Sequence, residues 1–367
     1  MGRNMNFFAC FVLILFPCTA FGQNTCFFDA IYQFGDSISD TGNFIRESSV
    51  GASTYGRLPY GMTYFQKPTG RCSDGRLMID FIASSFGLPY LNAYLDKYAT
   101  FNNGVNFAVA ASTALDTSVL RSKGIQPHFT NSSLSVQLGW FKNHLKTICS
   151  TETDCKKKLE NSLFMIGEIG GNDYIYVMTM QLMQQNNGNF LKFVLQSSNG
   201  AMQEVIHLGA RYVVVPGEFP VGCFPVFLSP LQNIVDQFAY DGLNCIPFGN
   251  MFAMYHNAQL IQAIAELKEE FPNVKILYAD YYSAFLRVLQ NAGNLGLEQD
   301  SLMKTCCGDG GGEHNFNFRK MCGQNGSQVC QDPGKRVSWD GIHLTEKAYK
   351  GMADWLINNL KPQLNCN

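Results

Sequence analysis

Five short apolar runs, separated by longer stretches with helical periodicity, limit the folds open to this chain. The runs are Ile31–Phe34, Val105–Val109, Leu163–Ile166, Tyr212–Val215 and Val274–Tyr278. Helical spacing of apolar residues is found over Leu77–Phe86, Ser135–Leu145, Gln203–Leu208 and Asn257–Glu269. Short strands buried on both faces and connected by helices are typical of a parallel sheet. The sequence therefore predicts an α/β fold, which a final helix near Thr345–Leu360 completes.

The composition is that of a globular protein with a large core. Of the 367 residues, 46% are hydrophobic and 15% are charged, and we interpret the chain as one large domain. The formal net charge of -2 leaves no basic excess that would hold phosphate backbones or anionic lipid. Nucleic acid is therefore excluded as an expected partner.

The N-terminus has the pattern of a secretory signal peptide. Arg3 precedes an apolar run over Phe7–Phe16, and small residues follow up to Gly22. The run is too short to span a bilayer, and a buried N-terminal helix is the alternative. We predict a signal peptide over residues 1–22 and a single domain over 23–367. The predicted location is the secretory pathway, ending in the extracellular space (apoplast) or the vacuole, without stable membrane insertion.

The cysteines and two sequons agree with that route. Thirteen cysteines fall to eleven after the predicted cleavage, and an oxidising compartment would pair most of them. A zinc site is the alternative for Cys306, Cys307, Cys322 and Cys330, but the Cys-x-x-Cys spacing of zinc ligands is missing. We expect disulfides of undetermined connectivity and at least one free thiol. Asn131 and Asn325 begin glycosylation sequons.

A serine follows the first apolar run directly. Ser37 lies in the segment Gly35–Asn43, at the end of a predicted strand where chemistry collects in parallel sheets. The residue types suit either an exposed nucleophile or an ordinary helix cap. The Gly-x-Ser-x-Gly elbow of α/β-hydrolases is missing here.

One histidine has a carboxylate in a position to orient it. Asp340 precedes His343 by three residues, just before the predicted last helix. A short turn would bring the carboxylate to one ring nitrogen and leave the other free to accept a serine proton. The alternative is an Asp-Gly turn with an incidental histidine. The other five histidines are expected to be surface or structural residues: His128, His144, His207, His256 and His314.

An asparagine follows the third apolar run. Asn172 lies in Gly167–Asp173, where its amide can donate to the oxyanion of an acyl transfer. Gly-Asn-Asp is equally good turn chemistry. Each of Ser37, Asn172 and the Asp340–His343 pair has an ordinary structural explanation when taken alone. Only their combination indicates an acyl-transfer site.

The three segments resemble, in order, blocks I, III and V of the plant GDSL esterase/lipase family within the SGNH hydrolase superfamily. Other segments that match this family are Pro59–Tyr64, Pro68–Arg76, Gly104–Ala108 and Ala279–Tyr282. The resemblance covers essentially the whole mature chain. It implies a three-layer, flavodoxin-like α/β/α sandwich with a five-stranded parallel sheet.

The same resemblance implies the site residues. Ser37 would be the nucleophile, His343 the base and Asp340 its orienting carboxylate, while Asn172 and the Ser37 amide would donate to the oxyanion. The family's third donor is a glycine amide, and this sequence places Ala110 and Ala111 where the glycines belong. Ala111 keeps an N–H but adds a methyl group at a position that favours glycine.

The predicted activity is hydrolysis of a small carboxylic ester through an acyl-serine, without metal or organic cofactor. The sequence is most similar to the acetylajmalan esterase and sinapine esterase branch, which favours an acetyl or hydroxycinnamoyl ester of an alkaloid or phenolic as substrate. An acyltransferase using the same acyl-serine and a weakened secreted binding protein are the alternatives. The enzyme is expected to be a monomer.

Overall fold

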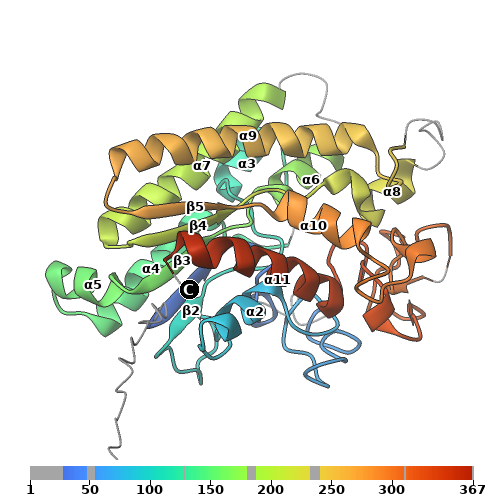
Figure 1. Cartoon of the computed structure of the whole chain (residues 1–367), viewed down its shortest axis with the longest axis horizontal. Coiled ribbons are helices and arrows are strands. Elements are labelled where there is room, and N and C mark those ends of the chain that lie inside the picture. The colour runs from blue at the N-terminus through green and yellow to red at the C-terminus, as the bar shows by residue number, and fades with distance from the viewer. Residues whose placement is uncertain are drawn as a thin grey trace, which may run out of the picture.

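A five-stranded parallel sheet forms the centre of the molecule in the computed structural model (Figure 1). The structure describes residues 28–47, 54–127, 129–179, 187–231, 240–309 and 311–365. The predicted signal peptide and His128 lie outside these residues. The strands are β1 (Ala30–Phe34), β2 (Gly104–Asn106), β3 (Ser162–Ile166), β4 (Tyr212–Pro216) and β5 (Lys275–Ala279), in the order β2-β1-β3-β4-β5. The fold class predicted from the sequence is confirmed.

Helices cover both faces of this sheet (Figure 1). The longer helices are α2 (Met78–Ser85), α4 (Leu134–Ile148), α5 (Glu152–Leu159), α6 (Gly171–Thr179), α7 (Asn187–Leu208), α9 (Pro247–Glu270), α10 (Tyr281–Gln290) and α11 (Glu346–Gln363). The short ones are α1 (Phe44–Glu47), α3 (Thr117–Ser122), α8 (Pro225–Leu231), η3 (Val221–Cys223), η5 (Gln299–Ser301) and η6 (Pro333–Lys335). A two-stranded hairpin, β6 (Cys307–Gly308) with β7 (Gln328–Val329), lies outside the main sheet.

Alternate residues of each strand belong to two different cores. Ile31 packs with α2, α10 and α11, whereas its neighbour Tyr32 packs with α4 and α7 on the opposite face. Leu163 and Phe164 of β3 divide in the same way. This is the period of two that a strand imposes on its side chains. Because each face of the sheet buries its own set of side chains under helices, the fold has three layers.

Several predicted elements have different bounds in the structure, among them the helix predicted at Asn257–Glu269, which belongs to the longer α9. The second strand ends at Asn106 rather than Val109, because the Asn106 side-chain oxygen accepts from the Ala108 amide and turns the chain. The helical pattern seen at Gln203–Leu208 belongs to the longer α7. Polar and glycine residues inside α7, such as Gly200, hid its apolar periodicity.

Among the described residues, eight cysteines form disulfides: Cys149–Cys155, Cys223–Cys245, Cys306–Cys330 and Cys307–Cys322. The late cysteine cluster is therefore a pair of disulfides rather than a zinc site, and Cys72 is a buried free thiol. Asn131 and Asn325 are both exposed. Within the described ranges, no helix combines the length and the apolar character needed to cross a membrane.

Candidate active site

The segment after β1 places Ser37 at the carboxyl edge of the central strands. Ser37 is buried, and the carboxylate of Asp36 accepts from the amide of Ile38 at 2.9 Å, which closes the turn around the serine. Gly35 has a φ of 146°, and a Cβ there would lie 2.9 Å from the Glu168 carbonyl oxygen. Only glycine fits between these two loops. The backbone on either side of Ser37 is therefore held in one conformation.

Asp40 ties the same segment to the chain after β2. Its buried carboxylate accepts from the amides of Gly42, Asn43, Phe44 and Ala110 at 2.6 to 3.0 Å. Burial raises the pKa of Asp40 to about 6, although the backbone hydrogen bonds oppose the shift. Asp40 therefore holds the Ser37 segment and the segment of Ala110 together.

Asp340 and His343 form a buried hydrogen-bonded pair. Oδ2 of Asp340 lies 2.7 Å from Nδ1 of His343, while Oδ1 accepts from the backbone amides of Ile342 and His343. Burial alone would raise the pKa of Asp340, but the charge of His343 and these hydrogen bonds outweigh it and lower the pKa. The carboxylate is therefore ionised and holds the ring in place. Nε2 of His343 is buried and has no hydrogen-bond partner among the described residues.

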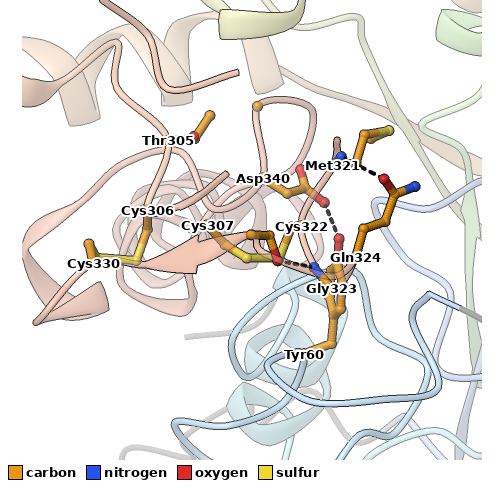
Figure 2. The surroundings of a disulfide bond; sticks show 12 residues. Tyr60, Thr305, Cys306, Cys307, Met321, Cys322, Gly323, Gln324, Cys330 and Asp340 are labelled. Atoms are coloured by element: carbon orange, nitrogen blue, oxygen red, sulfur yellow. Dashed lines mark hydrogen bonds between the residues drawn. A yellow bond between two sulfur atoms is a disulfide. The ribbon is translucent and has the colours of Figure 1, made fainter. Parts of the chain in front are cut away.

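A tyrosine that the sequence analysis gave no role completes this pair. The hydroxyl of Tyr60 donates to Oδ2 of Asp340 at 2.9 Å, and Tyr60 is fully buried (Figure 2). It packs in one cluster with Trp339 and the Cys306, Cys307 and Cys322 sulfurs. Nothing in a single sequence links Tyr60 to a residue 280 positions away, so this contact could not be predicted.

The loop of Asp340 and His343 is also fixed from the other side. The amides of Cys306 and Cys307 donate to the carbonyl oxygens of Ser338 and Trp339 at 2.9 and 2.7 Å. Figure 2 shows the two disulfides of this segment beside Asp340. The disulfide-bonded segment therefore supports the pair directly.

Asn172, in the first turn of α6, reaches across to the Ser37 loop. Its amide nitrogen donates to Oδ2 of Asp36 and to the carbonyl oxygen of Ser112, both at 2.9 Å. The next residue, Asp173, accepts from the amides of Ala114 and Leu115. An oxyanion would have to share or replace one of the two acceptors of Asn172.

The Ser37 loop also lies close to the histidine. Burial and the nearby Glu168 raise the pKa of Asp36 well above its usual range, and the charge of His343 opposes this shift. Asp36, next to Ser37, therefore lies within electrostatic range of His343, and it also accepts a hydrogen bond from Asn172. The segments of Ser37, Asn172 and His343 thus lie near one another.

The backbone at Ala111 has the conformation that glycine normally supplies. Ala111 has a φ of 65°, in the left-handed region that disfavours side chains. The amides on either side are engaged, because Ala110 donates to Asp40 and Ser112 donates to the Val109 carbonyl. Alanine at this position therefore carries backbone strain that glycine would not.

Two buried glutamates lie behind the Asn172 turn. Burial, followed by the charge of Glu218, raises the pKa of Glu168 well above its usual range. Burial also raises the pKa of Glu218 to about 8. Glu218 lies two residues after the end of β4, so the reasoning about strand ends that singled out Asn172 would have found it too.

The remaining described histidines have structural surroundings. His144 lies among aromatic rings, the Nδ1 atoms of His256 and His314 pair with Tyr174 and the Met303 carbonyl, and His207 packs against Phe271.

Comparison with known proteins gives the family. The model of the GDSL-like Lipase/Acylhydrolase family matches residues 31–356. The chain is 45% identical to acetylajmalan esterase 2 of Rauvolfia serpentina, over 93% of each chain. It is 42% identical to sinapine esterase of Brassica napus (90% of this chain, 85% of the relative). It is 39% identical to a GDSL esterase/lipase of Arabidopsis thaliana, over 98% of each. The chain belongs to the GDSL-like lipase/acylhydrolase family and is a carboxylic ester hydrolase.

Proposed function

We propose that this GDSL-family enzyme is a secreted serine esterase that hydrolyses a small ester through an acyl-serine at Ser37. The observation that carries the proposal is the buried Asp340–His343 pair, whose Nε2 atom is left for a proton from the nucleophile. A serine hydroxyl attacks esters only when a base takes its proton. The hydrogen bond from Nδ1 to Asp340 keeps the histidine in the tautomer that can do so.

The proposed reaction has two steps. Ser37 Oγ attacks the ester carbonyl while His343 Nε2 accepts the proton, and the protonated histidine then gives it to the leaving alcohol. The oxyanion is stabilised by the amide of Asn172 and by the backbone amides of Ser37 and Ala111. A water activated by His343 releases the acid and restores the serine.

The proposed substrate is an acetyl or hydroxycinnamoyl ester of a specialised metabolite such as an alkaloid or phenolic. The names of two relatives, acetylajmalan esterase 2 and sinapine esterase, support a small-molecule ester. Secretion is supported by the disulfides, since such bonds persist in oxidising compartments. The exposed Asn131 and Asn325 are the proposed glycosylation sites.

The test is hydrolysis of 4-nitrophenyl esters from acetate to palmitate by the mature protein and its Ser37→Ala variant. We expect activity that falls with chain length and is lost by about three orders of magnitude or more in Ser37→Ala. Ser122→Ala, at the exposed end of α3, is the matched control and should retain full activity. Equal rates for Ser37→Ala and the unaltered protein would refute the acyl-serine mechanism.

A further inference from the structure

The side chain of Asn172 has both of its N–H groups in use before any substrate binds. Its nitrogen donates to Oδ2 of Asp36 and to the carbonyl oxygen of Ser112, each at 2.9 Å. A side-chain amide has two donors and no more. An oxyanion can therefore receive a hydrogen bond from Asn172 only when one of these two acceptors shares or releases it.

The backbone around Asn172 is held independently of those two bonds. The amide of Gly171 donates to Oε1 of Glu168 at 3.3 Å. The carboxyl group of Asp173 accepts from two backbone amides of the chain after β2, at 2.8 and 3.1 Å. The side chain of Asn172 is itself partly exposed, so a ligand can reach it. The direction of its amide group is thus set by Asp36 and Ser112.

The two acceptors differ in how easily they can release a donor. Ser112 is fully buried, its amide donates to the Val109 carbonyl oxygen at 3.1 Å, and its hydroxyl donates to the Ser132 carbonyl oxygen at 2.6 Å. Its own carbonyl oxygen therefore belongs to a fixed backbone. Asp36 accepts with a side-chain oxygen and directly precedes Ser37. The N–H that Asp36 holds is the one at the nucleophile segment.

The chemistry of Asp36 suits a temporary acceptor. Its Oδ1 accepts from the amide of Ile38 at 2.9 Å, and only 3% of the residue is exposed, so the carboxyl group has a defined position. Burial, followed by the charge of Glu168, raises the pKa of Asp36 well above its usual range, which favours the neutral acid. A neutral oxygen is a weaker acceptor than a charged one. A negatively charged oxyanion can therefore take the N–H from Asp36.

We propose that Asp36 is a positioning residue for acyl transfer, whose Oδ2 aims one N–H of Asn172 at the Ser37 segment and yields it to the oxyanion as the ester is attacked. The inference rests on the proposed function, because it takes Asn172 as an oxyanion donor. Asp36 itself acts only through Asn172. It should therefore contribute to kcat rather than to KM, and only while Asn172 is present.

The test is a double-variant cycle of Asp36→Asn and Asn172→Ala, with kcat and KM measured for 4-nitrophenyl acetate. Asn172→Ala should lower kcat by about a hundredfold to a thousandfold, the usual cost of one oxyanion donor. Asp36→Asn keeps the shape of the side chain. When its oxygen stays bonded to the Ile38 amide, its NH₂ group faces the NH₂ group of Asn172 and displaces it.

We expect Asp36→Asn alone to lower kcat by roughly tenfold to hundredfold and to leave KM nearly unchanged, because the oxyanion donor is misplaced. In the Asn172→Ala background the same change should alter kcat by less than about threefold, since the group through which Asp36 acts is gone.

Two controls separate this coupling from general damage. Asp29→Asn changes an exposed aspartate just before β1 and should leave kcat unaltered. Tyr60→Phe acts on the histidine through Asp340, so it should lower kcat by about the same factor with and without Asn172. Thermal unfolding identifies any variant that does not fold. In that case Asp36→Ser takes its place, because a serine hydroxyl can accept from the Ile38 amide but is too short to reach Asn172 as well.

Losses that multiply in the double variant, or a change confined to KM, would overturn the role of Asp36. Full activity of Asp36→Asn or of Asp36→Ser would overturn it as well. Hydrolysis that persists in Ser37→Ala would instead count against the proposed function, so the two failures can be told apart.

Discussion

At the scale of single residues, Tyr60 acts on the site through Asp340. Its hydroxyl is the only side-chain donor to the Asp340 carboxylate besides His343 in the described part of the chain. Such a donor keeps the carboxylate at the angle that holds the imidazole ring. We therefore regard Tyr60 as a positioning residue rather than a catalytic one.

Tyr60→Phe should lower kcat by about tenfold and leave KM nearly unchanged, because one hydrogen bond of about 1–1.5 kcal/mol is lost from the support of the base. Steady-state kinetics with 4-nitrophenyl acetate measures this. Tyr98→Phe, which removes a hydroxyl from a residue 97% exposed, is the control. A rise in KM with constant kcat would assign Tyr60 to substrate binding instead.

Ala111 allows a second test at the residue scale. Ala111→Gly should stabilise the protein by about 0.5–1 kcal/mol, because it relieves a left-handed alanine. Ala110→Gly should destabilise it by about 1 kcal/mol, since Ala110 is fully buried and glycine has more backbone freedom to lose. Urea unfolding of the two variants measures the difference. The prediction fails if both changes have the same sign.

At the scale of elements, two segments hold the His343 loop against the start of α11. Thr345 caps that helix, where its side chain accepts from the Ala348 amide. Asp74 accepts from the amide of Glu346, and Arg76 pairs with the Glu346 carboxylate at 2.7 Å. On the other side, Cys306 and Cys307 hold the residues just before Asp340. The loop is thus fixed at both ends.

Removing the Cys307–Cys322 disulfide with two alanines should lower the free energy of unfolding by about 3 kcal/mol, from the entropy of a 15-residue loop. It should also reduce kcat, because the segment that holds Trp339 and Asp340 loosens. Denaturant unfolding and ester hydrolysis measure the two effects.

The matched control is removal of Cys149–Cys155, which closes a loop of only 6 residues and includes the start of α5. It should cost less stability and leave kcat unaltered. Equal losses of activity in the two double variants would contradict a supporting role for the Cys307–Cys322 segment.

At the scale of the whole molecule, buried carboxyl groups make stability depend on pH. Burial is the main cause that raises the pKa of Asp173 to about 7 and of Glu218 to about 8. In the unfolded chain the same groups lose their protons near pH 4. Between pH 6.5 and 8 a rise in pH therefore removes protons from these two carboxyl groups only in the folded state and so destabilises it. His256, whose pKa is lowered, has its effect below this window.

The expected result is a free energy of unfolding lower by about 1–2 kcal/mol at pH 8 than at pH 6.5. Thermal unfolding across this range measures it, and Glu218→Gln should flatten the dependence. Stability that is constant or rises over the same interval would contradict the raised pKa values of these groups.

The α/β class and the residues Ser37, Asn172, Asp340 and His343 follow from the sequence alone. Strands and helices differ in the period of their apolar residues, and the carboxyl ends of parallel strands gather at one edge. A contact within a short turn can also be predicted from the sequence. Asp340 and His343 are three residues apart, so their contact does not depend on the rest of the fold. Strand-end and turn chemistry left an alternative open for each of these residues, and the family resemblance is what assigned their roles.

Only the tertiary structure decided the rest, because it depends on contacts between residues far apart in the chain. Tyr60 meets Asp340, Glu218 meets Glu168, and Cys223 pairs with Cys245 because the fold brings these distant segments together. The left-handed backbone of Ala111 is likewise imposed by its neighbours, since alanine does not favour it. Periodicity and turn chemistry identify the elements of this protein, and burial between them sets the charges and contacts of its site.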